Sequence, residues 1–288
     1  MTTLKSLCAV AALALLAPGG LRAAADDYVL VWSDEFNKDG PLDAKDWNFE
    51  QGFVRNNEDQ WYQPDNAVCK DGVLLIEARR EHRPNPRYVP GSGDWRKSRP
   101  SIEYTSSSIN TRGKHTWTYG RFEIRARIDT RQGAWPAFWT LGTSERWPAN
   151  GEIDIMEFYR KELLFNVAWA RGGNGGSVWN SVWKPLASYP DDFSSKFHVW
   201  RMDWDAAAIK LYLDDVLVNV QDLTAPLRDA PASYKPFNAP VYLLINLAIG
   251  GQNGGDPSAT QFPMKYEIDY VRVYQKRASG LDGLKTGG

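Results

Sequence analysis

Alternation of apolar and polar residues is the feature that most limits how this chain can fold. In the segment 120–129, Gly-Arg-Phe-Glu-Ile-Arg-Ala-Arg-Ile-Asp, apolar residues alternate with Arg and Glu. A period of two places the apolar side chains on one face, which is typical of a half-buried β-strand. Similar short segments, separated by Gly, Pro, Asn and Asp, are 72–79, 105–111, 152–159, 163–170, 198–204, 209–213, 241–249 and 266–274. The pattern predicts an all-β fold in which two antiparallel sheets pack as a sandwich.

The ends of the chain differ from this pattern. Residues 1–25 contain one early lysine, a short apolar run and a final Ala-Ala-Ala, which is the layout of a secretory signal peptide. Residues 277–288 are polar and rich in glycine, and are expected to form a flexible tail. We therefore predict one catalytic β-sandwich domain over residues 26–276, in a protein that is secreted or periplasmic.

Charge and length exclude some classes of partner. The 288 residues contain 34 Lys and Arg against 35 Asp and Glu, a balance that argues against binding nucleic acid by neutralising phosphates. The apolar run near the N-terminus is too short to span a bilayer, and no later segment is long enough. We expect a monomer without a membrane span.

Three carboxylates lie close together in one strand-like segment. Residues 151–158 read Gly-Glu-Ile-Asp-Ile-Met-Glu-Phe, so Glu152 and Asp154 project from one face of a strand. Glu157 has the opposite parity, but a β-bulge at Met156 would turn it to the same face. The segment thus predicts three acids on one face.

Tryptophans accompany these acids. The segment 133–142 reads Gly-Ala-Trp-Pro-Ala-Phe-Trp-Thr-Leu-Gly, and Trp147 follows it. Indole rings stack on the apolar face of a pyranose, and paired carboxylates can cleave a glycosidic bond. The combination predicts a groove that binds and cleaves sugars.

In these motifs the chain resembles glycoside hydrolase family 16, and within it the laminarinase-type branch, whose acidic motif carries the extra bulge residue. Further motifs follow in the family's order at 32–36, 56–62, 108–128, 197–204, 246–251 and 268–274. The resemblance implies a β-jelly-roll with a concave substrate cleft. It also implies an endo-acting, retaining β-glycoside hydrolase that needs no cofactor for catalysis. Carried over to this chain, Glu152 is the nucleophile, Glu157 the acid/base, and Asp154 lies between them.

The motifs also suggest residues that contact the substrate. The candidates are Trp135, Trp139, Asn57, Arg112, Trp147, Trp169 and Asn166. For Asn57 and Arg112 a turn or surface role is an equal alternative. Other tryptophans near strand ends, among them Trp179 and Trp183, are expected in part to extend the groove, whereas Trp200 and Trp204 are expected in the core. The long polar segments 82–100 and 171–195 are expected to be functional loops.

Many family members hold a structural calcium ion, and the resemblance places its ligands at Glu35, Asp269 and a carbonyl near Gly72. Carboxylate and carbonyl oxygens suit calcium. The alternative is a structural ion pair or a cap.

One departure from the family concerns the substrate. Many laminarinase-type members carry a His-Trp pair in the strand after the acidic one, whereas here residues 165–169 read Phe-Asn-Val-Ala-Trp. The leading prediction is cleavage of laminarin-like β-1,3-glucan through a covalent glycosyl-enzyme. An endo-β-galactosidase or galactanase acting on algal, plant or mucin-type glycan stays open, as does a transglycosylase. A non-catalytic carbohydrate-binding protein is disfavoured, because a lectin gains nothing from three clustered acids.

Overall fold

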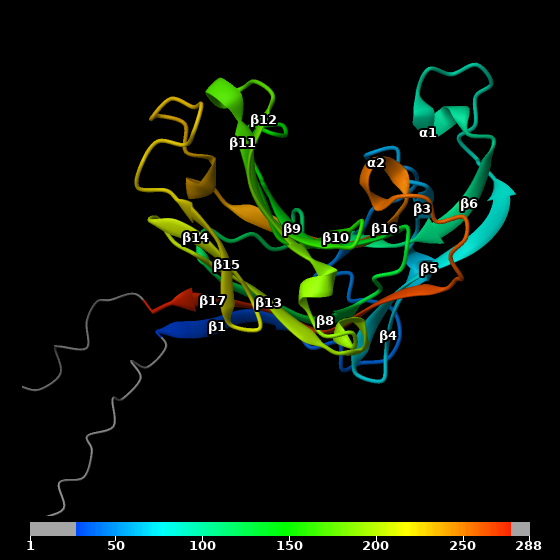
Figure 1. Cartoon of the computed structure of the whole chain (residues 1–288), viewed down its shortest axis with the longest axis horizontal. Coiled ribbons are helices and arrows are strands. Elements are labelled where there is room, and N and C mark those ends of the chain that lie inside the picture. The colour runs from blue at the N-terminus through cyan, green and yellow to red at the C-terminus, as the bar shows by residue number, and fades with distance from the viewer. Residues whose placement is uncertain (1–26, 278–288) are drawn as a thin grey trace, which may run out of the picture.

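The computed structural model describes residues 27–277, in which two β-sheets pack face to face (Figure 1). This confirms the predicted sandwich. The larger sheet has ten strands: β15 (Val216–Asp222), β14 (Ala208–Leu213), β13 (His198–Trp204), β8 (Gly120–Ile128), β17 (Met264–Lys276), β5 (Val73–Pro84), β6 (Ser101–Ser106) and β3 (Gln60–Tyr62) in this order, with β1 (Tyr28–Asp34) beside β17 and β4 (Ala67–Lys70) beside β5. The smaller sheet has seven: β12 (Ser177–Pro185), β11 (Glu162–Ala170), β10 (Glu152–Tyr159), β9 (Ala134–Gly142), β16 (Val241–Ile249), β7 (Ser108–Asn110) and β2 (Asn48–Phe49).

Pairing is antiparallel throughout both sheets except between β3 and β6, which run parallel. Helical segments in the described part of the chain are short: α1 (Trp95–Ser98), α2 (Gly251–Gly254), and the 3-10 turns η1 (Pro64–Asn66), η2 (Arg171–Gly173), η3 (Leu186–Ser188), η4 (Phe193–Ser195) and η5 (Pro236–Asn238). None of the helices in residues 27–277 has the length and apolar character needed to cross a membrane. The predicted signal peptide and the tail beyond residue 277 lie outside the described residues.

The alternation in β8 sets up the core as predicted. Its apolar residues face the other sheet and are at most 2% exposed. Its charged residues face outward and pair across the strands, for example Arg121 with Asp203 and Arg127 with Glu267. Trp200 is also buried in this core, as expected.

The two long segments expected to be loops are partly regular structure. β5 extends to Pro84, and α1 interrupts the rest of the segment 82–100. The segment 171–195 contains β12, the end strand of the smaller sheet. In β12, Val178, Asn180 and Val182 lie on one face and Trp179, Ser181 and Trp183 on the other, so apolar and polar residues are mixed on both faces and the alternation is hidden.

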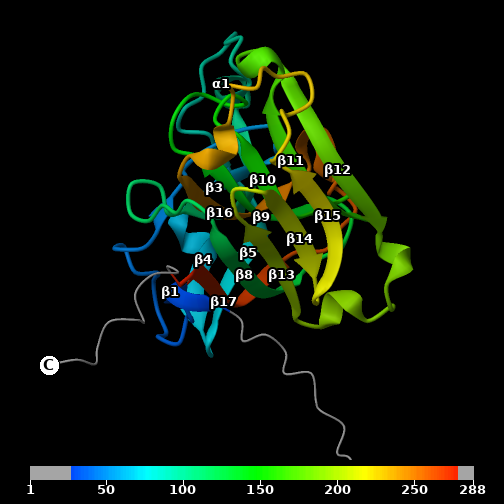
Figure 2. The same cartoon turned by 90° about the vertical axis from the view of Figure 1, so that its left-hand side faces the viewer.

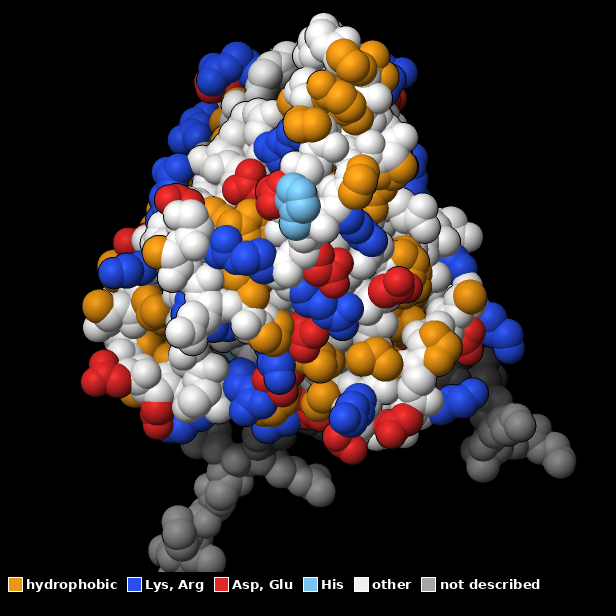
Figure 3. Space-filling model, turned by 90° about the vertical axis from the view of Figure 1, so that its right-hand side faces the viewer, with side chains coloured by type: hydrophobic (Ala, Val, Ile, Leu, Met, Phe, Trp, Pro, Cys, Tyr) orange, Lys and Arg blue, Asp and Glu red, His pale blue; other side chains and the backbone are white. Residues whose placement is uncertain are grey.

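The end strands of the two sheets, β12 and β15, lie side by side (Figure 2), where Asn180 Nδ2 donates to the carbonyl of Val220 at 3.0 Å. The opposite side of the molecule carries basic and acidic side chains interspersed with one another (Figure 3). The seven-stranded sheet has one face on the core. Its other face is turned away from the larger sheet and lies between β11–β12 on one side and the segment that carries α1 on the other (Figure 1).

Candidate active site

A β-bulge in β10 brings the three acids to one face. The pairing with β9 shifts register between Asp154 and Met156, and the pairing with β11 shifts between Asp154 and Glu157. Ile155 and Met156 are both fully buried in the core. Two successive residues thus point inward, and Glu157 returns to the face of Glu152 and Asp154. The predicted bulge is confirmed.

The three carboxylates line a pocket of about 610 Å³ on the outer face of the seven-stranded sheet. Its floor comes from β9, β10 and β11. The lining residues are Arg55, Asn56, Trp135, Trp139, Leu141, Trp147, Glu152, Asp154, Glu157, Tyr159, Asn166, Trp179, Ser181, Trp183 and Asn253.

Glu157 receives a donor on each carboxylate oxygen. Trp135 Nε1 donates to Oε1 at 2.8 Å, and Asn166 Nδ2 donates to Oε2 at 3.0 Å. Burial among protein atoms nevertheless raises the pKa of Glu157 to about 7, because desolvation outweighs these hydrogen bonds and the charge of Glu152 adds to it. Near neutral pH this side chain can therefore hold or release a proton.

Asp154 and Glu152 influence each other through a hydrogen bond and through their charges. Asp154 is 2% exposed, and burial together with the charges of Glu157 and Glu152 raises its pKa well above the usual range. A protonated Asp154 can donate to Glu152, which also accepts a hydrogen bond from Trp147 Nε1. Burial raises the pKa of Glu152 as well, and these two donors oppose that effect. The arrangement favours a negative charge on Glu152 and a proton on Asp154.

The structure brings only part of the predicted substrate-binding set together. Trp135, Trp139, Trp147 and Asn166 line the pocket with the acids. Trp139 is 8% exposed, and its Nε1 donates to Asn246 Oδ1 at 2.8 Å. Four of the seven candidates therefore lie where a substrate could reach the carboxylates.

The other three candidates lie elsewhere. Trp169 is 2% exposed in the core between the sheets, and its Nε1 donates to the carbonyl of Arg228. Trp169 was expected to contact the substrate, and this expectation is wrong, because the odd-numbered residues of β11 face the core. Asn57 lines a neighbouring pocket beside α2, and Arg112 is exposed with its guanidinium 5.7 Å from the ring centre of Tyr242.

Several lining residues were not singled out from the sequence. Arg55 pairs with Glu50, and its guanidinium lies 5.2 Å from the ring centre of Trp139. Its only signal was its position directly before a family motif at 56–62. Asn253 comes from α2, and its only signal was its position two residues after the family motif at 246–251.

The predicted calcium ligands have other partners. Glu35 accepts two hydrogen bonds from Arg272, at 2.9 and 2.7 Å, and Asp269 pairs with Arg125. Within residues 27–277, no group of three or more His, Cys, Asp and Glu side chains is arranged to hold a metal ion. As placed, both carboxylates are neutralised by arginine, which is the alternative considered for them, and the calcium ion stays a prediction.

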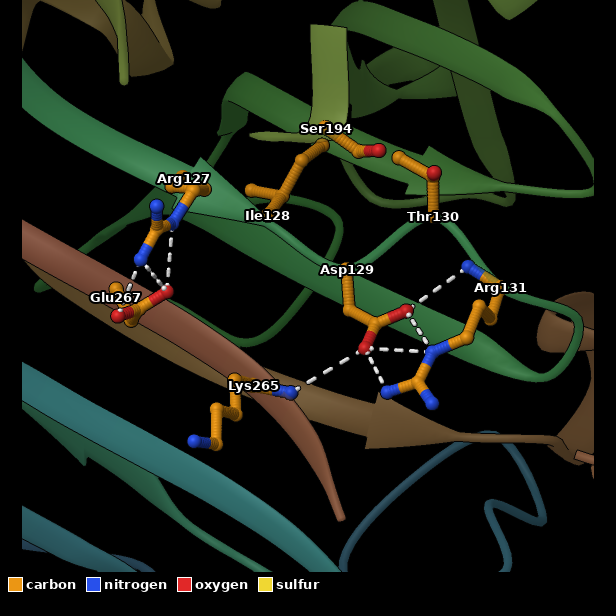
Figure 4. A pocket seen from close by; sticks show the side chains of 8 residues that line it. All are labelled: Arg127, Ile128, Asp129, Thr130, Arg131, Ser194, Lys265 and Glu267. Atoms are coloured by element: carbon orange, nitrogen blue, oxygen red, sulfur yellow. Dashed lines mark hydrogen bonds and ion pairs between the residues drawn. The ribbon is translucent and has the colours of Figure 1, made fainter. Parts of the chain in front are cut away.

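A further pocket lies on the ten-stranded sheet, but its charges are paired. Arg127 forms two hydrogen bonds to Glu267, and Arg131 binds Asp129 (Figure 4). Its volume is about 230 Å³. Both of its carboxylates are paired with arginine and no aromatic side chain of residues 27–277 lines it, so this pocket is a weaker candidate for sugar cleavage than the one on the smaller sheet.

A jelly-roll sandwich with clustered, partly protonated carboxylates and indole rings on one open face defines a class of protein, the enzymes that hydrolyse glycosidic bonds. Within this class the chain belongs to glycosyl hydrolases family 16, whose family model matches residues 55–272. The suspected family is thereby confirmed.

Individual relatives agree with this assignment. A beta-glucanase of Rhodothermus marinus is 37% identical over 273 residues, which cover 87% of this chain and 86% of that protein. A solved laminarinase catalytic domain from Thermotoga maritima is 33% identical with a TM-score of 0.72, over 88% of this chain and 100% of that one. A solved structure from work on endo-acting O-glycanases, expressed by prominent members of the human gut microbiota to initiate mucin breakdown, is 34% identical with a TM-score of 0.79, over 89% and 94%.

Proposed function

We propose that this glycoside hydrolase cleaves β-1,3-glucan within the chain, with retention of configuration. The observation that carries the proposal is the single row of Glu152, Asp154 and Glu157 on β10, in which the pKa of Glu157 is raised to about 7. A retaining enzyme needs one carboxylate as a nucleophile and one carboxylic acid as a proton donor. The row supplies both at neutral pH.

In the first step, Glu157 donates its proton to the oxygen of the leaving sugar while a Glu152 oxygen attacks the anomeric carbon. The glycosidic C–O bond breaks, and an ester bond between Glu152 and the sugar forms. In the second step, Glu157 takes a proton from water, whose oxygen displaces Glu152 from the anomeric carbon. Each carboxylate thus returns to its starting state.

Asp154 and Asn166 hold this pair in position. Asn166 Nδ2 donates to Asp154 Oδ2 at 3.1 Å as well as to Glu157, so one amide links two of the acids. A proton on Asp154 stabilises the charge of Glu152 before attack. Because that charge disappears when the ester forms, Asp154 modulates the balance of both steps without touching the leaving group.

The glucan assignment rests on the relatives named beta-glucanase and laminarinase. One observation favours the second candidate, an endo-β-galactosidase or mucin-type O-glycanase. The residue before Trp169 is Ala168, which faces the pocket side of β11 in register with Glu152. The His of the family's His-Trp pair is therefore replaced by a methyl group near the nucleophile, and the solved O-glycanase-related structure has a TM-score of 0.79.

A substrate screen tests both candidates. The protein lacking residues 1–25 is incubated with laminarin, lichenan, agarose, galactan and mucin, and released oligosaccharides are identified by mass spectrometry. Predominant release from laminarin supports the glucanase, whereas release from mucin or galactan alone replaces it with the second candidate. NMR of the first product measures retention, and an inverted anomer contradicts the mechanism.

Three further expectations belong to this proposal. We propose that residues 1–25 direct export and are removed, that residues 26–276 act as one domain, and that the protein is monomeric. N-terminal sequencing of the exported protein and light scattering measure these properties. Metal analysis after dialysis, with melting curves in calcium and in chelator, measures whether a structural calcium ion is bound.

A further inference from the structure

One segment of the chain concentrates positive charge. Residues 79–99, the basic arm, contain seven Lys and Arg against two Asp and Glu. The whole chain contains 34 against 35, so the rest of it contains 27 basic and 33 acidic residues. A local excess of one sign raises the concentration of partners of the opposite sign. The cleavage of a neutral glucan makes no use of this charge.

The basic arm is a fixed structure. It comprises the end of β5, α1 and the turns around α1, and its two limbs are joined because Val89 N donates to the carbonyl of Lys97 at 2.8 Å. Asn85, 4% exposed, donates from Nδ2 to the carbonyls of Arg96 and Arg99 at 3.2 and 2.9 Å. The arm rises on the side of the sheet opposite to β11–β12 (Figure 1), and basic side chains border the upper part of Figure 3, where it lies.

Arg99 joins the arm to the segment that lines the pocket of the acids. Its guanidinium donates to the carbonyl of Asn57 at 2.8 Å and to that of Glu58 at 2.7 Å. The two residues directly before these, Arg55 and Asn56, line the pocket. A polysaccharide chain that leaves the pocket on this side therefore passes the arm.

Much of the positive charge of the arm is not neutralised. Three of its cations form ion pairs: Arg79 with Glu77, Arg96 with Asp94 and Arg99 with Asp59. The other four have no ion-pair partner within residues 27–277: Arg80, Arg83, Arg87 and Lys97. Of these, Arg80 donates to backbone carbonyls of residues 257–260 and Arg83 donates to the Gln63 amide, and such neutral partners leave the charge in place.

The remaining two cations are open to a ligand. Arg87 and Lys97 are exposed, and neither side chain has a hydrogen bond within the part of the chain that the structure describes. The Arg87 guanidinium lies 5.0 Å from the ring centre of Trp61, and Gly52 leaves it space, because a Cβ there would lie 2.5 Å from Arg87 Nη1. Contact with a ring restrains a guanidinium while its N–H groups stay free to bind an anion.

We propose that the basic arm binds the acidic groups, carboxylate or sulfate, of a polysaccharide chain that extends from the pocket. Arg87 forms paired hydrogen bonds to such a group, and Lys97 adds a second charge on the neighbouring limb. A polymer fits better than a membrane surface, since one thread-like chain can occupy the pocket and pass the arm at once. This inference rests on the proposed function and deepens it, because it adds negative charge to the class of substrate.

Binding is measured with dextran sulfate, an α-linked polyanion that a β-glycoside hydrolase does not cleave, and with uncharged dextran. The arm variant carries Arg87→Gln and Lys97→Gln. The matched control carries Lys70→Gln and Lys210→Gln, which remove two exposed charges from β4 and β14, outside the arm. Lys97→Gln alone repeats the comparison if loss of Arg87 disturbs the packing on Trp61.

The wild type should bind dextran sulfate and not dextran, and more weakly as salt is added, since exposed charges are screened. The arm variant should bind dextran sulfate about threefold to twentyfold more weakly at low ionic strength, because two exposed ion pairs are lost, and Lys97→Gln alone about twofold to fivefold. The matched control should stay within about twofold of the wild type. Equal losses in the arm variant and the control would overturn the proposal. Binding to vesicles of phosphatidylglycerol without binding to dextran sulfate would also overturn it.

Kinetics test whether the acidic groups lie on the chain that is cleaved. Values of kcat/KM are measured on laminarin and on the same laminarin lightly carboxymethylated. The arm variant should lose about threefold to tenfold on the carboxymethylated chain and stay within about twofold on laminarin. Equal losses on the two chains, or no loss on either, would contradict a site for acidic groups of the substrate.

Failure of the glucanase assignment gives a different result. In that case the wild type hydrolyses neither form of laminarin, whereas binding of dextran sulfate and its weakening in the arm variant can still be measured. The substrate that the screen identifies, with and without acidic groups, then replaces laminarin in the kinetic comparison.

Discussion

Replacing Trp135 by Phe isolates one hydrogen bond to the proton donor. The indole Nε1 of Trp135 donates to Glu157 Oε1 at 2.8 Å and favours the ionised carboxylate. The pKa of Glu157 is already raised to about 7 by burial. Phe retains the aromatic contact with Tyr159 and removes only the donor, so the pKa of Glu157 should rise further.

The expected rise in the pKa of Glu157 follows from the strength of its hydrogen bond with Trp135. A hydrogen bond to a charged group contributes about 1.5–3 kcal/mol, and one pKa unit corresponds to about 1.4 kcal/mol. Glu157 is partly open to the pocket, so water can replace some of the lost interaction. We therefore expect a rise of about 0.5–1 unit, below the full value of the bond.

The assay is the pH dependence of kcat/KM, which reports the pKa values of groups in the free enzyme. Glu157 must be protonated to act as an acid, so activity falls as the pH rises through its pKa. The midpoint of that basic limb should move from near pH 7 towards pH 8 in Trp135→Phe. Trp139→Phe is the control, because the Trp139 indole donates to Asn246 and not to a carboxylate. A basic limb that stays in place, or moves to lower pH, would refute the assignment of Glu157.

Four other changes test the site. Glu152→Gln and Glu157→Gln should each lower kcat by at least about a hundredfold with the fold retained in circular dichroism, and near wild-type turnover in either contradicts its role. Because the pKa of Glu157 is raised in the folded state, its ionisation opposes folding above pH 4.5. Glu157→Gln should therefore raise the melting temperature at pH 8 but not at pH 4. An equal change in melting temperature at both pH values argues against the raised pKa. Trp139→Ala should lower both kcat/KM and the melting temperature, since a side chain 8% exposed also packs the sheet; unchanged melting would show that it acts only as a sugar platform. Arg55→Met should move the acidic limb of the pH profile of kcat/KM to higher pH, because the Arg55 charge lowers the pKa of Glu152. Arg55→Lys keeps the charge and should return the acidic limb to its wild-type position. Arg127→Met removes an ion pair with Glu267 that lies outside the pocket, and its pH profile should not change.

The fold could be predicted because its signal is local. Strict alternation in β8 forces one face inward whatever the strand's partners are, and the structure confirms it. The order of strands in each sheet carries no such signal, since it depends on which edges meet after the chain folds. β12 was missed for a related reason: it is an end strand with tryptophans on its open face, so its alternation does not separate apolar from polar residues.

The candidate site divides in the same way. Parity and one bulge were sufficient to place the three acids on one face of β10, whereas Trp135, on the adjacent strand β9, was placed beside them by the family resemblance. Parity was not applied to Trp169, which lies one residue out of phase with the pocket side of β11. Arg55 and Asn253 reach the pocket from segments whose position is fixed only by tertiary packing, and sequence patterns cannot reveal such contacts.

The bulge in β10 has a consequence for insertions and deletions. If Met156 is deleted, the second glutamate moves to position 156 and gains the parity of Glu152 and Asp154, so all three acids still share one face. The ladder with β9 and β11 becomes regular, and the distance along the strand from the first acid to the last hardly changes. Such a deletion keeps the second glutamate on the pocket face but removes a fully buried side chain from the core, so its cost falls on stability and not on the facing of the acids.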